Sequence, residues 1–148
     1  MPGIVVGVDG SAHSRQALVW ALREAAVHHR PLIVITVRRG TVRPVTEIYW
    51  PMPDYPESTN LDEESVRKAA REMVDEAAAE TEEPAPEVTV TVVTGNPAEE
   101  LVRAGRDADV LVVGSHGSGG FASLLLGSVS SQVVHHASCP VVVVRAPR

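Results

Sequence analysis

The sequence predicts an open three-layer α/β domain, in which helices cover both faces of a five-stranded parallel sheet. Five short runs rich in valine and isoleucine alternate with segments of helical periodicity, and this alternation favours right-handed βαβ units. Four of the runs are nearly continuous in apolar residues, which is typical of strands buried on both faces. The five expected strands are residues 4–8, 32–37, 88–93, 110–113 and 141–144.

The third run differs from the other four. Residues 88–92 alternate valine with threonine, and such alternation indicates a strand with one wetter face. We therefore expect this strand nearer an edge of the sheet.

Helices are expected over residues 14–29, 60–82, 97–106 and 128–136. Ser11 or Ser14 is the predicted N-cap of the first helix, and Thr59 or Asn60 that of the second. The first helix has a predicted apolar face of Leu18, Ala21, Leu22 and Ala25. The second has a predicted apolar face of Val66, Ala69, Met73 and Ala77.

Size and composition favour a single domain over residues 1–148. The net charge is −6, with lysine and arginine scattered among acids, which argues against nucleic acid as a partner. The amino-terminal segment reads as a strand and not as a signal peptide, and the longest apolar runs are too short to span a bilayer. Cys139 is the single cysteine, so no intramolecular disulfide is possible. We therefore expect a cytoplasmic protein, with Cys139 as a small buried residue.

Residues 38–58 interrupt the alternation of strands and helices. The segment has four prolines and no clear period, and a loop of this length is usually functional or mobile. A packed surface loop, a lid and a dimer contact all stay open as its role.

A glycine-rich stretch follows the fourth expected strand. Residues 114–120 read GSHGSGG, a composition that exposes backbone N–H groups to a phosphate without interference from Cβ atoms. Residues 127–130 read GSVS at the start of the last helix, where N–H groups and the helix dipole favour an anion. The Ser128 and Ser130 hydroxyls can donate to the same oxygens. Two such elements favour a polyphosphate.

The better-known phosphate motifs match poorly. A Walker A motif would need a lysine where the chain has Gly120. A dinucleotide fingerprint over residues 117–122 would follow the wrong strand and lacks the later acidic residue. A glycine-rich connection without any ligand is the remaining alternative.

The chain resembles the universal stress protein family at these positions. Nucleotide-binding members carry a glycine, two residues, a glycine, nine residues, and then glycine with serine or threonine; here these are Gly114, Gly117, Gly127 and Ser128. The resemblance continues through residues 8–11, 108–117 and 138–144. It implies a sheet in the order 3-2-1-4-5, ATP binding, and homodimers through the last strand. That strand comprises Val141, Val142, Val143 and Val144.

Carried over by position, the resemblance also implies the site residues. Asp9 would reach the ribose or the adenine edge, although it could serve only as a turn former or helix cap. Val37 would contact adenine, and Gly7 inside a strand is typical of close approach by a ligand. Ser118 departs from the arginine or lysine of many members, which lowers the expected phosphate affinity. The phosphates and ribose would contact Gly114, Ser115, His116, Gly117, Ser118, Gly119, Gly120, Gly127, Ser128, Val129 and Ser130.

The expected function is that of a regulatory protein of the stress response that holds ATP with little or no turnover. The loop lacks a P-loop lysine and a pair of metal-binding carboxylates, which fast phosphoryl transfer would need. Three alternatives stay open: a slow ATPase that uses Asp9 with Mg²⁺ or Mn²⁺, a protein that binds AMP or cyclic AMP, and an interaction protein with an empty loop.

Overall fold

The computed structural model describes residues 3–39, 62–82, 84, 87–116 and 127–146. Most of the segment 38–58 and the predicted site residues Gly117, Ser118, Gly119 and Gly120 lie outside these ranges. The elements are β1 (Ile4–Val8), α1 (Ala12–His28), β2 (Leu32–Arg39), α2 (Glu63–Ala78), β3 (Val88–Gly95), α3 (Pro97–Ala104), β4 (Val110–Gly114), α4 (Ser128–His136) and β5 (Val141–Val144).

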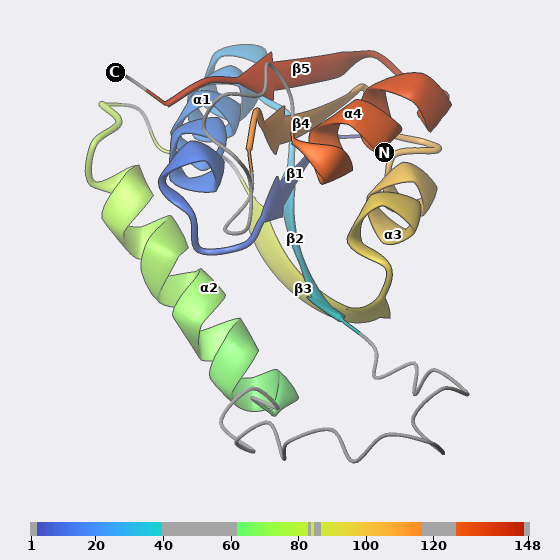
Figure 1. Ribbon diagram of the computed structural model, residues 1–148. Helices are drawn as coiled ribbons and strands as arrows, with labels where there is room; N and C mark the ends of the chain where they lie inside the picture. The colour runs from blue at the N-terminus through green and yellow to red at the C-terminus, as the bar shows by residue number, and fades with distance from the viewer. Residues whose placement is uncertain (1–2, 40–61, 83, 85–86, 117–126, 147–148) are drawn as a thin grey trace, which may run out of the picture.

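The five strands form one parallel sheet in the order β3-β2-β1-β4-β5. Figure 1 shows α1 and α2 against one face and α3 and α4 against the other. The predicted three-layer fold and strand order are therefore confirmed. β3 lies at an edge, as its alternating sequence predicts.

Two apolar clusters hold the layers together. In the central strand β1, Val6 and Val8 point into the cluster beneath α1 and α2, while Val5 points into the cluster beneath α3 and α4. All five residues of β1 are buried, because each face of a central parallel strand is covered by a helix layer. Leu18 and Leu22 of α1 are buried in the first cluster, as predicted.

Helix α1 begins two residues earlier than predicted. Its N-cap is Ser11, whose hydroxyl oxygen accepts from the Ser14 backbone N–H at 3.2 Å. His29 ends the helix in the left-handed conformation with φ of 53°.

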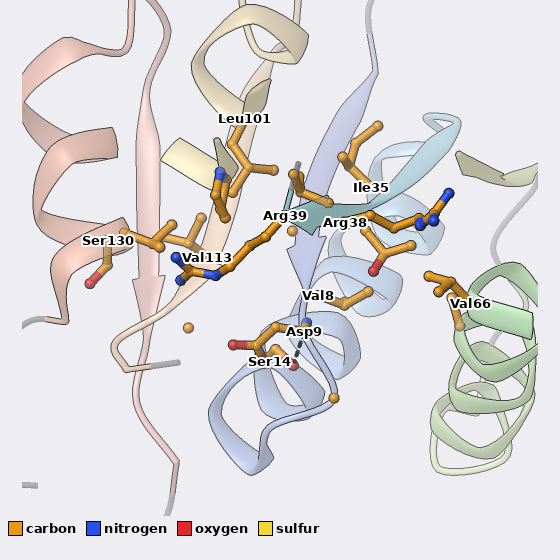
Figure 2. Close-up of a pocket in the computed structure, with 18 of the residues that line it drawn as sticks. Val8, Asp9, Ser14, Ile35, Arg38, Arg39, Val66, Leu101, Val113 and Ser130 are labelled. Atoms are coloured by element: carbon orange, nitrogen blue, oxygen red, sulfur yellow. Dashed lines mark hydrogen bonds between the residues drawn. The ribbon is translucent and has the colours of Figure 1, made fainter. Parts of the chain in front are cut away.

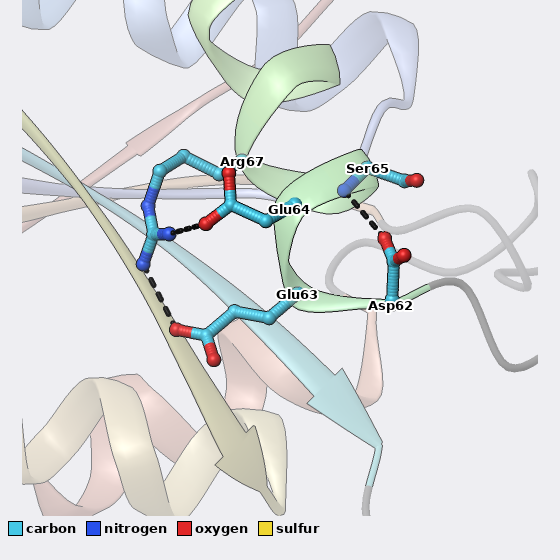
Figure 3. Close-up of polar contacts among 5 residues, drawn as sticks. All are labelled: Asp62, Glu63, Glu64, Ser65 and Arg67. Carbon is cyan, nitrogen blue, oxygen red and sulfur yellow. Dashed lines mark hydrogen bonds and ion pairs between the residues drawn. The ribbon is translucent and has the colours of Figure 1, made fainter.

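Helix α2 begins after Asp62, so the predicted caps Thr59 and Asn60 were wrong. One oxygen of the Asp62 carboxylate accepts from the Ser65 backbone N–H at 2.7 Å (Figure 3). Hydrogen bonding to Ser65 lowers the pKa of the Asp62 carboxyl, and the positive charge of Arg38 lowers this pKa further. In the first turn, Arg67 pairs with the carboxylates at positions 63 and 64 (Figure 3).

The apolar face of α2 also differs from the prediction. Ala69 is exposed, while Ala70 and Val74 are buried beside Ala77. The buried residues Ala70, Val74 and Ala77 are spaced by four and then three positions, so they share the side of the helix that faces the sheet. The helix ends at Ala78, earlier than the predicted residue 82.

The second strand is longer than predicted. Arg38 and Arg39 belong to β2, because they pair in register with Thr94 and Gly95 of β3. The expectation that an irregular segment begins at residue 38 was therefore wrong by two residues.

The remaining elements follow the sequence pattern closely. Asn96 caps α3 through a hydrogen bond from the Glu99 N–H at 3.1 Å, although α3 ends at Ala104, not Arg106.

Cys139 is half-buried, and this burial raises the pKa of its thiol. Within the described ranges no helix is long and apolar enough to cross a membrane.

Candidate functional site

A cavity of about 580 Å³ opens at the carboxyl ends of the strands. It lies over the junction of β1 and β4, which are neighbours in the sheet although their connections lead to opposite sides. Such a topological switch point is where open parallel α/β sheets bind ligands.

One wall of the cavity is built by strands that project beyond β1. Val8, the last residue of β1, pairs with Thr36, whereas β2 continues through Val37 to Arg39 beside β3. The opposite side is built by the end of β4 and the first turn of α4, through Gly114 and Ser128.

The cavity brings together most of the predicted site residues that the structure describes. Its lining includes Gly7, Asp9, Val37, Gly114, His116, Ser128, Val129 and Ser130. Ser115 and Gly127 are not part of the lining and support it from behind, as their hydrogen bonds show.

The ends of β4 and α4 are joined by hydrogen bonds to one carbonyl. The Ser115 carbonyl oxygen accepts from the Gly127 N–H at 2.6 Å and from the Ser130 hydroxyl at 2.9 Å. Ser130 is only 2% exposed, and its single hydroxyl proton has protein acceptors here. A hydroxyl contact from Ser130 to a phosphate therefore stays a prediction, and the visible role of Ser130 is to position α4.

This junction presents the start of α4 to the cavity. Gly127 is the N-cap, and it makes no side-chain capping hydrogen bond. The first N–H groups of a helix have no intrahelical acceptor, and the dipole places partial positive charge at the same end. Ser128, the first residue of α4, is exposed and lines the cavity. This end of the cavity can accept an anion.

Two glycines of the site are required by packing. A Cβ atom at Gly114 would lie 2.7 Å from the backbone carbonyl carbon of His13, so α1 could not approach β4. A Cβ atom at Gly7 would lie 2.8 Å from both methyl carbons of Leu101. The close approach predicted at Gly7 is therefore made, in this structure, by a side chain of α3.

Asp9 forms a turn and also faces the cavity. One carboxylate oxygen accepts from the Ser11 N–H at 2.9 Å, and the Asp9 N–H donates to the Ser14 hydroxyl at 3.2 Å. The turn-forming role that the sequence left open is thus present. The side chain is nevertheless exposed and lies in the cavity lining (Figure 2).

A polar cluster behind the cavity ties it to the chain after β5. The Ser115 hydroxyl oxygen lies 3.0 Å from His13 Nδ1 and 3.2 Å from His116 Nδ1. The Ala146 N–H donates to the same His13 nitrogen at 3.2 Å. Ser115 is 1% exposed, so it makes no part of the surface itself. Its hydroxyl contact with His116 helps to hold that ring in the lining.

Two cationic residues of the lining, Arg38 and Arg39, were not predicted from the sequence. Figure 2 shows Arg38 directed toward Val66 of α2 and Arg39 directed across the cavity toward Val113 and Ser130. Their signal in the sequence is a pair of arginines directly after an apolar run, a pattern that is also typical of the start of a loop.

The described lining is positive although the chain is acidic. It has two arginines and a single carboxylate, that of Asp9, whereas the whole chain has a net charge of −6. Across the described ranges, no cluster of three or more histidine, cysteine, aspartate or glutamate residues could hold a metal ion. The local charge favours an anionic ligand.

Together these features define an open parallel α/β domain with a ligand cavity at its switch point. The chain belongs to the universal stress protein family, whose model matches residues 2–145.

Relatives of known sequence agree with this membership. A universal stress protein of Mycolicibacterium smegmatis is 37% identical over 146 residues, which cover 96% of this chain and 47% of the relative. One of Thermus aquaticus is 34% identical over 144 residues, which cover 96% of this chain and 97% of the relative. The chain spans about half the length of the mycobacterial relatives that it matches.

Solved structures share the fold. A universal stress protein from Lactobacillus plantarum superposes with a TM-score of 0.78 at 23% identity, covering 97% of each chain. A universal stress protein in complex with cyclic AMP superposes with a TM-score of 0.65 at 28% identity, covering 99% of this chain and 98% of the other.

Proposed function

We propose that this chain binds an adenine nucleotide, ATP, in the switch-point cavity and holds it with little or no turnover. Its role would be that of a cytoplasmic regulatory protein of the stress response, in which the occupied and empty states differ in their contacts with a partner. The observation that carries the proposal is the cavity itself, which combines an open helix N-terminus with a positively charged lining. A relative of the same fold in complex with cyclic AMP supports the ligand class.

The geometry suggests how the nucleotide would be held. The phosphates would accept from the N–H groups of the first turn of α4, beside Ser128. The apolar side chain of Val37 would contact adenine at the opposite wall, and Asp9 between the two would accept from ribose hydroxyls. The divalent metal that accompanies ATP would be held by the phosphates and water, as Mg²⁺ commonly is.

Slow turnover is supported by the charged groups of the lining. Fast phosphoryl transfer requires a positioned metal and a group that orients the nucleophile. Among the described lining residues, Asp9 is the single carboxylate, and one of its oxygens already accepts from the Ser11 N–H. A slow ATPase that uses Asp9 with Mg²⁺ or Mn²⁺ is the enzymatic alternative.

Cyclic AMP or AMP is the second candidate ligand. The relative in complex with cyclic AMP is 28% identical over nearly the whole chain, so a monophosphate is a chemically reasonable occupant of the same site. Competition between ATP, AMP and cyclic AMP for the purified protein would separate the candidates.

We also propose a homodimer joined through β5. Among the described strands it pairs only with β4, at the edge of the sheet, and all four of its valines are half-buried. An apolar edge strand invites pairing with another strand, and a second copy of the chain would satisfy it.

The test of ATP binding is mass spectrometry of the nucleotide released by denaturing freshly purified protein, followed by titration of the emptied protein. Near-stoichiometric ATP, unchanged after incubation with Mg²⁺ or Mn²⁺, is the expected result. Recovery of ADP that accumulates with metal would favour the hydrolase, and AMP or cyclic AMP would change the ligand. An empty protein that takes up no nucleotide would contradict the proposal.

A further inference from the structure

Arg39 is the last residue of β2, and its position in the strand sets the direction of its side chain. Side chains two residues apart in a strand lie on the same face, so Arg39 shares a face with Val37. Val37 packs on the cluster beneath α3 and α4, so Arg39 lies on the side of α4. Arg38 lies on the opposite face, toward α2 (Figure 2).

The overhang of β2 brings the Arg39 side chain over the cavity. Because β2 continues three residues past the pair of Val8 and Thr36, Arg39 stands at the rim, roughly 6–7 Å along the strand beyond Val37. Figure 2 shows its side chain directed toward Val113 and Ser130, on the side of α4. An arginine at the far wall is thus aimed at the end of the cavity that favours anions.

The charge of Arg39 has no protein partner in the described part of the chain. None of the ion pairs among the described residues involves Arg39, whereas Arg30, for example, pairs with Asp109 at 3.6 Å. The charge of Arg38 acts on Asp62, so the two neighbouring arginines differ in surroundings as well as in direction. Arg39 thus extends into the cavity without an ion pair to a described residue, and its charge is available to an anionic ligand, although the Asp9 carboxylate lines the same cavity.

The glycine-rich stretch supplies no comparable cation. Residues 114–120 and 127–130 include neither lysine nor arginine, so these two segments offer a polyphosphate only backbone N–H groups, hydroxyls and the His116 ring. Arginine binds phosphate through a planar fork of N–H donors, which a side chain arriving from the opposite wall can deliver.

We propose that Arg39 is the phosphate-binding cation of this site, closing over the nucleotide from β2 and pairing with its phosphates. This inference rests on the proposed nucleotide site and adds to it a residue that determines specificity for the phosphorylated ligand. Affinity should therefore rise with the number of phosphates, and Arg39 should account for most of that rise.

The experiment compares dissociation constants of ATP, ADP, AMP and adenosine for the wild-type protein and Arg39→Gln. A matched control is Arg23→Gln, which removes the same charge from an exposed position on α1 outside the cavity lining. We expect Arg39→Gln to weaken ATP about tenfold or more and adenosine less than twofold, which is the pattern of a charge-assisted phosphate contact. Arg39→Lys should recover part of the ATP affinity, and Arg23→Gln should match the wild type.

The other outcomes are decisive. An equal loss for ATP and adenosine would overturn the inference, because Arg39 would then act on the base or on the fold. Unchanged ATP affinity in Arg39→Gln would also overturn it and leave the nucleotide site intact. A wild-type protein that binds none of the four ligands would overturn the proposed function, and this inference with it.

Discussion

At the scale of single residues, the site depends on a glycine whose missing Cβ atom leaves room for a neighbouring helix. Gly114 allows the backbone of His13 to approach β4, because a Cβ atom there would lie 2.7 Å from the His13 carbonyl carbon. The neighbouring residue Ser115 supplies the carbonyl that fixes the start of α4. The same few residues therefore determine both the packing of α1 and the shape of the cavity where α4 begins.

Gly114→Ala should destabilise the fold. The added methyl group meets backbone, which cannot rotate away, and overpacking of this kind costs about 1–3 kcal/mol. Urea unfolding followed by circular dichroism measures the free energy of unfolding. Gly10→Asn is the comparison, since nothing lies within 4 Å of its added Cβ and its cost comes only from the φ of +85°, which asparagine tolerates better than most residues; its loss should be the smaller one. A Gly114→Ala variant as stable as the wild type would show that the contact with α1 relaxes freely.

At the scale of elements, the first turn of α2 depends on a titratable cap. The Asp62 carboxylate accepts from the Ser65 N–H, and Arg67 bridges to the carboxylates of positions 63 and 64 in the same turn (Figure 3). Hydrogen bonding to Ser65 is the main cause that lowers the pKa of Asp62. A lowered pKa in the folded state links the stability of this helix end to pH.

The contribution of the Asp62 cap should be lost in acid. Because folding lowers the pKa of this carboxyl, its stabilising effect is complete above the ordinary value of 3.8 and disappears as the pH falls through the lower, folded value. The melting temperature of the wild type should therefore exceed that of Asp62→Ala above about pH 5 and approach it below pH 3.8. Asp62→Asn retains a capping side chain without a titrating group, so its advantage over alanine should not depend on pH. A difference between wild type and Asp62→Ala that is constant across this range would contradict the assignment.

The edge strand β5 is the second element that leads to a prediction, because it is the proposed dimer interface. If a copy of the chain pairs with this strand, a charge on it should separate the dimer. Val143→Lys should convert a dimer into a monomer in light scattering, while Thr89→Lys on the opposite edge strand β3 should leave the dimer intact. A lysine stem can keep its apolar carbons on the sheet while its charge reaches water, so the fold should persist, as circular dichroism would check. A wild-type monomer, or a dimer unaffected by Val143→Lys, would contradict this interface.

At the scale of the whole molecule, local patterns predict the sheet well because burial dominates them. The continuous apolar runs at residues 4–8 and 110–113 lie in the centre of the sheet, and the alternating run at 88–93 lies at its edge. The strand order itself came from the family resemblance. The presence of the end of β4 and the start of α4 in the cavity lining could also be expected from glycine and serine alone.

What the sequence could not predict are features created by pairing between distant segments. Arg38 and Arg39 are charged and precede an irregular segment, so nothing local marks them as strand; their pairing with Thr94 and Gly95 extends β2. The cavity wall depends on that extension. Likewise, the reason for Gly114 is the position of His13, which lies about a hundred residues earlier in the chain and meets it only in the folded state.

The central claim is that an adenine nucleotide occupies the cavity with its phosphates at the start of α4. The most direct measurement is titration of ATP into Ser128→Glu and Gln132→Glu, two variants of α4 with the same added charge. Glutamate in the first turn favours the helix, so Ser128→Glu should fold, but its carboxylate would occupy the phosphate position. The account predicts that Ser128→Glu loses at least tenfold in ATP affinity while Gln132→Glu, exposed and outside the cavity lining, binds like the wild type. Equal ATP affinity for the two variants would contradict it.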